Sequence, residues 1–246
     1  MEKITSRQNE KIKHLTSLCE EKYRKEYQEF VMEGILNLKM ALASNMVKEI
    51  YSTKELNDID ISDDIKTYLV DDKVMDKISK EKNPSGIVFI ARYLTYPNKK
   101  YKKILYLDDI QDPGNLGTII RTSLALHIDV IYLSANSANI YNPKVLSSSR
   151  GAIFNIPVIN MDFFDLIKTK DDKTKIISTS LGKNSVPLEK CPRFDSYILV
   201  LGNEGRGIKK EIIDSSDYVV NIPIDERIDS LNVAIASGIL LYYFNN

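Results

Sequence analysis

A short apolar run that leads into a glycine-rich turn constrains this chain most. Residues 197–201, YILVL, are all apolar, as expected for a buried strand. The next residues, GNEGRGI, contain three glycines, which allow a ligand to approach the backbone N–H groups closely. The pattern predicts a buried strand followed by a turn that can hold a cofactor or an anion, with Glu204 and Arg206 on the turn.

The spacing of the glycines limits which cofactor fold this turn can belong to. Gly202, Gly205 and Gly207 do not follow the G-x-G-x-x-G spacing of dinucleotide-binding folds, which argues against a nucleotide-dependent oxidoreductase. The Lys-Ser/Thr pair of a P-loop is also absent. Taken alone, the turn also fits an ordinary connection between a strand and a helix.

The composition excludes several classes of protein. At 246 residues, 43% hydrophobic and 28% charged, the chain is typical of globular proteins with one or two domains. Two cysteines and two histidines give little support to a disulfide framework, a metal site or His-based catalysis. No secretory signal is visible, and the longest apolar stretch is shorter than the roughly 20 residues that span a bilayer. We therefore expect a cytoplasmic protein without a membrane span.

The formal net charge is zero, so the total charge does not by itself indicate a nucleic-acid partner.

Short apolar runs alternate with helical patterns, which predicts an α/β fold. A polar, basic segment around Pro97 predicts a linker over residues 96–103, between domains at 1–95 and 104–246. In the first domain, we expect a helix over 7–26 with Ser6 as its N-cap. In the second, we expect strands at 104–108, 130–133, 175–179, 197–201 and 218–222, helices at 116–126 and 163–168, and a last helix from Ser230.

Three further motifs accompany the glycine-rich turn: DPGNLGTIIRT at 112–122, SSRGA at 148–152 and IPIDERIDSLNVAIA at 222–236. In this order and spacing, the four motifs resemble those of the SpoU (TrmH-type) ribose 2′-O-methyltransferases of the SPOUT superfamily. The resemblance covers roughly residues 104–246. At the start of the chain, ITSRQN and FVMEG resemble the RNA-binding domain that is appended to many SpoU enzymes. An unrelated α/β domain is the alternative for this first part.

The resemblance implies a fold, a reaction and partners. The C-terminal domain would be a trefoil knot built on a parallel sheet, and the chain would form a homodimer. The enzyme would move a methyl group from S-adenosyl-L-methionine to a ribose 2′-hydroxyl of RNA, without a metal. Because transfer-RNA enzymes of the family often lack the extra N-terminal domain, ribosomal RNA is the favoured substrate. A transfer-RNA enzyme and a non-catalytic RNA-binding protein that keeps the fold are the alternatives.

The resemblance also assigns roles to individual residues. Arg121 would stabilise the developing alkoxide or clamp a neighbouring phosphate, because a guanidinium rarely gives up its proton. Glu204 would orient Arg121. The other expected catalytic residues, which would hold the ribose, are Asn115, Ser230 and Asn232. The expected cofactor-binding residues are Ser180, Gly202, Asn203, Gly205, Ile222 and Leu231.

Several of these residues also have a purely structural interpretation. Asn115 and Ser230 could be helix N-caps, and Arg121 could lie on a solvated helix face. The chain departs from the family at Glu226, where glycine is usual, and Arg227 follows it. A bulky charged side chain there raises the question of how the loop beside the cofactor is shaped. The five intact catalytic candidates argue against the non-catalytic alternative.

Overall fold

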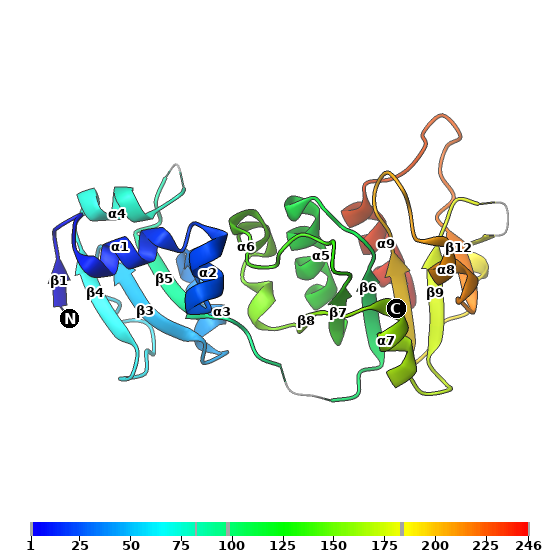
Figure 1. Cartoon of the computed structure of the whole chain (residues 1–246), viewed down its shortest axis with the longest axis horizontal. Coiled ribbons are helices and arrows are strands. Elements are labelled where there is room, and N and C mark those ends of the chain that lie inside the picture. Colours follow the sequence, from blue (N-terminus) through cyan, green and yellow to red (C-terminus); the bar gives the residue numbers. More distant parts are fainter. Residues whose placement is uncertain (1, 82, 97–98, 183–184, 246) are drawn as a thin grey trace. The chain divides into compact units, whose positions relative to one another are not determined.

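The computed structural model describes residues 2–81, 83–96, 99–182 and 185–245. The chain divides into two compact units (Figure 1). The first contains Met1–Tyr96 and Tyr141–Asn155, and the second contains Pro97–Ile140 and Ile156–Asn246. No helix in the described part of the chain is long and apolar enough to cross a membrane.

The first unit is built on a five-stranded sheet with the order β1-β4-β3-β5-β2. Its strands are β1 (Glu2–Ile4), β2 (Glu29–Glu33), β3 (Val47–Ser52), β4 (Lys66–Val70) and β5 (Ile87–Arg92). Strand β5 runs antiparallel to both of its neighbours, whereas β1, β4 and β3 pair in parallel. Helices α1 (Glu10–Ser17), α2 (Glu21–Tyr27), α3 (Ile35–Leu42) and α4 (Asp72–Ile78) complete this part of the unit. Leu15, Val74 and Ile90 are among the residues of its core.

The single helix expected over residues 7–26 is wrong, because the structure has two helices, α1 and α2, in its place. Asn9 rather than Ser6 caps α1, with its side chain accepting from Lys11 N over 2.9 Å. The break follows Ser17, where Arg24 Nη1 donates to the carbonyl oxygens of Leu18 and Cys19. Those bonds satisfy carbonyls that a continuous helix would have bonded internally.

A segment from later in the chain also belongs to the first unit. It contains α6 (Pro143–Ser149) and the 3₁₀ helix η1 (Ala152–Phe154). Phe30 of β2 lies 5.0 Å from the Tyr141 ring and 5.9 Å from the Phe154 ring, measured between ring centroids. The expected domain limits, 1–95 and 104–246, assigned this segment to the C-terminal part; they remain a prediction about which parts fold independently.

The second unit is built on a seven-stranded sheet with the order β10-β12-β9-β11-β6-β7-β8. Every pair of neighbouring strands in it is parallel. Its strands are β6 (Lys103–Leu107), β7 (Val130–Leu133), β8 (Val158–Asn160), β9 (Lys175–Thr179), β10 (Val186–Pro187), β11 (Tyr197–Leu201) and β12 (Tyr218–Asn221). The parallel α/β sheet is confirmed, and the strands at 130–133, 175–179 and 197–201 lie where the apolar runs predicted them.

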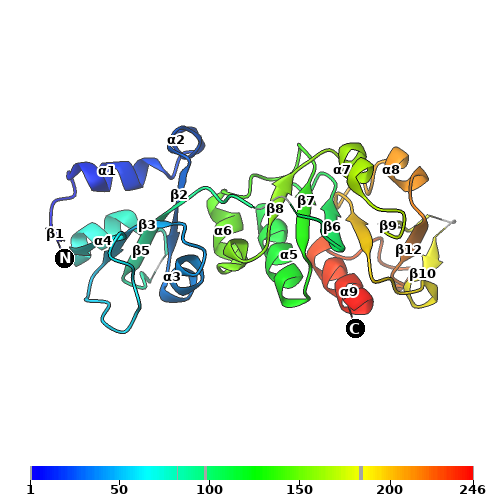
Figure 2. The same cartoon turned by 90° about the horizontal axis from the view of Figure 1, so that it is seen from below.

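Helices cover both faces of this sheet. They are α5 (Pro113–Ala125), α7 (Phe163–Thr169), α8 (Lys210–Asp214) and α9 (Val233–Asn245), with a 3₁₀ turn η2 at Leu188–Lys190. Figure 2 shows α5 and α9 on one face and α7 and α8 on the other. Since parallel strands end at the same edge, the loops that follow β6, β9, β11 and β12 meet there. This edge carries most of the predicted site residues.

Candidate active site

The glycine-rich turn after β11 is a tight hairpin closed by its own backbone. Asn203 N donates to Gly207 O over 3.1 Å, and Gly207 N donates to Asn203 O over 2.9 Å. A Cβ atom added to Gly202 would lie 2.3–2.5 Å from backbone atoms of Gly207 and Ile208. Gly207 has φ +70°, a conformation that favours glycine. The close approach of two backbone segments therefore requires glycine at position 202.

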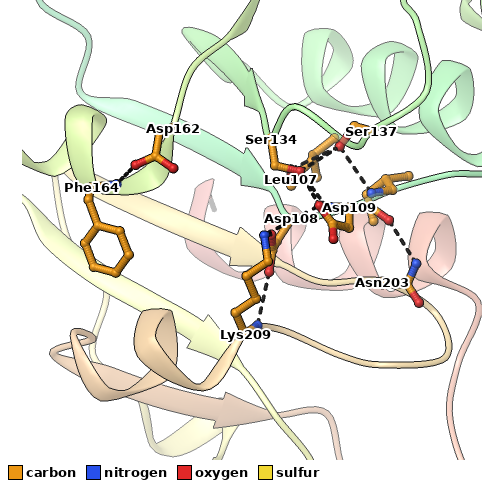
Figure 3. A network of polar contacts seen from close by, with 10 residues as sticks. Leu107, Asp108, Asp109, Ser134, Ser137, Asp162, Phe164, Asn203 and Lys209 are labelled. Atoms are coloured by element: carbon orange, nitrogen blue, oxygen red, sulfur yellow. Dashed lines mark hydrogen bonds and ion pairs between the residues drawn. The ribbon is translucent and has the colours of Figure 1, made fainter.

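Asn203 holds the hairpin against the loop that follows β6. Its Oδ1 accepts from Gly205 N over 2.9 Å and from Arg206 N over 3.1 Å. Its Nδ2 donates to Asp109 O over 2.9 Å, as Figure 3 shows. Because these three bonds occupy both ends of the amide, the side chain of Asn203 shapes the turn.

Two adjacent aspartates that were not predicted as site residues, the buried Asp108 and the half-buried Asp109, support the same turn. Asp108 is 1% exposed, and its carboxylate accepts from Lys209 N over 3.0 Å and pairs with Lys209 Nζ over 3.1 Å. Burial alone would lower the pKa of Lys209, but the carboxylates of Asp108 and Asp109 raise it above its usual value. Asp109 also accepts from the Ser134 hydroxyl over 2.8 Å (Figure 3). The only sequence signal for this network was the position of both aspartates directly after a buried strand.

A cavity of about 490 Å³ opens beside the hairpin, within the second unit. A volume of this size fits a ligand as large as a nucleoside derivative. All six expected cofactor-binding residues line it: Ser180, Gly202, Asn203, Gly205, Ile222 and Leu231. Glu204 and Ser230 line it as well, whereas Asn115, Arg121 and Asn232 do not. Apolar side chains, including Ile208, Ile213 and Leu240, form much of the remaining wall. The cavity and the close backbone at Gly202 fit an adenosine-containing cofactor with a hydrophobic body and a few polar groups.

Three expected catalytic residues form a chain of side-chain hydrogen bonds at the rim. Asn232 Nδ2 donates to Asn115 Oδ1 over 3.0 Å, and Asn115 Nδ2 donates to Glu204 Oε1 over 2.8 Å. Helix α9 sets the donor-to-acceptor direction of these hydrogen bonds, because Asn232 Oδ1 accepts from Ala234 N over 2.9 Å. The Asn232 amide must therefore present its nitrogen to Asn115, which must in turn present its own nitrogen to Glu204. We call these three residues the amide relay.

The expected N-cap of the last helix is wrong. Helix α9 begins at Val233, and Asn232 caps it by accepting from the backbone nitrogens of Ala234 and Ile235. Asn is as good a cap as Ser, and the cap position avoids the cost of Asn inside a helix. Ser230 therefore lies on the loop, where it lines the cavity. Asn115 is not a cap either, because Asp112 caps α5 by accepting from Asn115 N over 2.7 Å.

Arg121 lies apart from the amide relay. It is exposed on α5, and no hydrogen bond or ion pair joins its side chain to another described residue. Arg121 follows Asn115 by six positions in α5, a rotation of about 600°, so the two side chains leave α5 on different faces. Glu204 was expected to orient Arg121, but its carboxylate accepts a hydrogen bond from Asn115 instead.

The loop that carries the departure from the family pattern is closed by a local ion pair. Arg227 Nε and Nη2 donate to the two carboxylate oxygens of Asp225, each over 2.8 Å. These bonds lower the pKa of Asp225 to about 2. The Glu226 side chain is exposed and does not line the cavity. No cluster of His, Cys, Asp or Glu among the described residues could hold a metal ion.

Comparison with known proteins decides the family. The SpoU rRNA Methylase family matches residues 102–242, and the MRM3-like substrate binding domain matches residues 9–88. This chain belongs to the SpoU rRNA methylase family. Membership confirms the expected class of enzyme, an RNA methyltransferase that uses S-adenosylmethionine. The N-terminal match is to a substrate binding domain.

Relatives of this SpoU methylase match it along nearly its whole length. The 23S rRNA (guanosine(2553)-2′-O)-methyltransferase RlmP of Bacillus subtilis is 31% identical, over 99% of each chain. An AdoMet-bound rRNA methyltransferase of Sinorhizobium meliloti is 27% identical with a TM-score of 0.88, over 98% of this chain and 96% of that one. The SpoU methyltransferase AviRb of Streptomyces viridochromogenes, 19% identical with a TM-score of 0.79 over 96% and 97% of the two chains, shares the fold.

Proposed function

We propose that this SpoU methylase transfers a methyl group from S-adenosylmethionine to the 2′-hydroxyl of a guanosine in 23S ribosomal RNA. The observation that carries this proposal is the match to RlmP over 99% of both chains, which includes the N-terminal domain. A guanosine equivalent to the one in the name of RlmP is the first candidate target. The matched substrate-binding domain supports ribosomal RNA over transfer RNA.

The cavity beside the hairpin is the proposed cofactor site. Backbone groups of Gly202, Ile222 and Leu231 would contact the cofactor, and the Ser180 hydroxyl lies at the end of β9 to add a polar contact. When bound there, S-adenosylmethionine supplies an electrophilic methyl group on a sulfonium. The 2′-oxygen forms a bond to that methyl carbon as the sulfur–carbon bond breaks, and the 2′-hydroxyl proton leaves to an acceptor. Alignment of the hydroxyl with the methyl group is therefore a large part of the catalytic task.

The residues at the rim would orient the ribose. Within the amide relay, Asn115 donates to one carboxylate oxygen of Glu204. Glu204 and the hydroxyl-bearing Ser230 both line the cofactor cavity. Arg121 would meet the negative charge that develops on the 2′-oxygen or bind the adjacent phosphate. Because Arg121 and Asn115 leave α5 on different faces, we propose that Arg121 acts in a site completed by a second copy of the chain.

An exposed apolar stripe supports this homodimer. Ile235, Ile239 and Tyr242 of α9 are 58%, 40% and 64% exposed. Their spacing places them on one face of the helix, which Asn232 of the amide relay caps. Light scattering should report a dimer for the wild type and a monomer for Ile239→Glu. A wild-type monomer at micromolar concentration would refute the dimer.

Membership of the family supports two finer proposals. We propose that the C-terminal segment forms a trefoil knot, with α9 passed through the loop formed by preceding residues. We also propose that the enzyme works in the cytoplasm, where ribosomal RNA is its substrate. An experimental structure traced continuously from residue 197 to 245 tests the knot, and an unthreaded α9 would refute it.

Methyl transfer from labelled S-adenosylmethionine to unmodified 23S rRNA tests the activity in vitro. We expect label at a single guanosine ribose in 23S rRNA and none in transfer RNA. Label in transfer RNA alone would replace the proposed substrate, and binding of 23S rRNA without any transfer would favour the non-catalytic alternative.

A further inference from the structure

A second cavity, of about 560 Å³, lies within the first unit, and it shares no lining residue with the proposed cofactor site. Its wall combines residues of the N-terminal fold with α6 and Arg150. We call it the α6 cavity. It includes part of the SSRGA motif, which plays no part in the cofactor cavity, because none of residues 148–152 lines that cavity.

The charged side chains in the wall of the α6 cavity are mainly basic. They are Arg24, Lys80, Lys144 and Arg150, against Glu33 and Glu81. Glu33 is already engaged, because its carboxylate accepts from the Ser79 hydroxyl and from Lys80 N over 2.6 Å. The side chains of Lys80 and Arg150 form no ion pair with another described residue and are exposed at the cavity. This composition favours an anionic ligand.

Arg24 supplies a second and independent indication of an anion. The residue is only 5% exposed, and its guanidinium donates to two backbone carbonyls through Nη1. Its buried Nε has no hydrogen-bond partner, and no carboxylate pairs with it among the described residues. A buried cation without a counter-charge is unfavourable, and an anion bound in the cavity would compensate it.

Local backbone geometry holds Arg150 in this wall. Arg150 ends α6 with φ +50°, and Gly151 follows with φ +81°. A Cβ atom at Gly151 would lie 2.9 Å from Met40 Sδ and 3.2 Å from Asn37 Oδ1, so the turn packs closely on α3. Two successive residues of positive φ thus fix the backbone from which the Arg150 side chain extends.

We propose that the α6 cavity binds a phosphate of the RNA backbone, with Arg150 and Lys80 as the contacting cations and Arg24 as the buried charge behind them. The proposal rests on the RNA substrate of the proposed function and adds a place where the substrate is held. Phosphate contacts position an RNA and contribute most of the salt dependence of its binding. A free mononucleotide offers the same chemistry, so the test must separate the two sources.

The test measures binding of a fluorescein-labelled 23S rRNA fragment that contains the proposed guanosine, over a range of salt concentrations. Arg150→Gln and Lys80→Gln should each weaken binding about tenfold. Each should lower the slope of log affinity against log salt by about 1, as expected for one lost phosphate contact. The KM for RNA should rise while kcat at saturating RNA and cofactor affinity stay at wild-type values.

Lys13→Gln is the matched control, because it removes one positive charge from an exposed side chain of α1 that does not line the α6 cavity. If Arg150→Gln and Lys80→Gln match this control in affinity and slope, the phosphate site is refuted even when the wild type methylates RNA. If the slopes fall as expected but the wild type transfers no methyl group, the proposed function fails and the phosphate site stands. Guanosine monophosphate should not displace the RNA at millimolar concentration. The contrary result is that guanosine monophosphate displaces the RNA from the wild type but not from Arg150→Gln, while Arg150→Gln binds RNA as tightly as the wild type. That result would assign the cavity to a free nucleotide and overturn the proposal.

Discussion

Asn115 donates a hydrogen bond to Glu204 over 2.8 Å, although the two residues are 89 positions apart in the chain. This bond joins α5 to the hairpin after β11. Its direction depends on Asn232, whose amide oxygen is committed to the first turn of α9. The cap of one helix therefore orients the carboxylate that lines the proposed cofactor cavity.

The amide relay predicts that two substitutions of Asn232 separate stability from activity. Asn232→Asp keeps an oxygen for the cap, so the thermal midpoint should stay near that of the wild type. The new carboxylate cannot donate to Asn115, which would turn its amide and present oxygen to Glu204. We expect methyl transfer to fall about tenfold or more through loss of this oriented bond. Asn232→Ala should lose as much activity and also about 1 kcal/mol of stability. Wild-type turnover in Asn232→Asp would show that the relay does not position Glu204.

Gly202 and Gly205 offer a matched pair in the hairpin. An alanine at 202 would overlap backbone atoms 2.3–2.5 Å away, whereas at 205 the nearest atom is Asn203 Oδ1 at 3.6 Å. Gly202→Ala should therefore open the hairpin, cost about 2 kcal/mol or more of stability and weaken S-adenosylmethionine binding. Calorimetric titration and thermal melting test this. Equal behaviour of the two variants would show that the close approach at Gly202 is unimportant.

Arg121 should act on the reaction and not on cofactor binding. Arg121→Ala should lower kcat by roughly 10²-fold or more, as loss of one preorganised donor does. Arg121→Lys keeps the charge but loses the planar fork, so it should recover little. Single-turnover methyl transfer to saturating RNA, with cofactor titration of each variant, provides the measurement. Undiminished turnover in Arg121→Ala would remove this residue from the mechanism.

The Asp225–Arg227 pair predicts a local dependence on pH. Because the folded pKa of Asp225 is about 2, below the unfolded value of about 3.9, the pair stabilises the loop above roughly pH 4. That contribution is lost as the pH falls towards 2, and it is small since both groups are exposed to solvent. In NMR titrations, Arg227→Gln should return the Asp225 carboxyl to a midpoint near 4, whereas Glu226→Gln should not move it. An unchanged midpoint in Arg227→Gln would show that the pair does not form in solution.

The apolar runs predicted the central strands β6, β7 and β11 well because nearly all of their residues are buried, on both faces of the sheet. The break between α1 and α2 was not predictable from periodicity, because it depends on where the guanidinium of Arg24 finds carbonyl acceptors. The cap of α9 was misplaced since Ser230 and Asn232 are equally suitable by residue type.

In the candidate site too, some features were predictable from motifs and others depend on the folded structure. Motifs brought the cofactor-binding candidates to one cavity, because they all follow parallel strands that end at one edge. The partnership of Glu204 with Asn115 and not Arg121 depends on helical phase across α5, which a motif does not convey. The support from Asp108 and Lys209 was missed because aspartates directly after a strand have many structural uses.

We propose above all that this SpoU methylase methylates the 2′-hydroxyl of one guanosine in 23S ribosomal RNA. Nucleotide-resolution mapping of ribose methylation, in cells with and without the gene, tests it most directly. We predict that a single methylated guanosine of 23S rRNA disappears when the gene is deleted and returns with the wild-type gene but not with Arg121→Ala. An unchanged methylation map of 23S rRNA in the deletion strain would contradict the account.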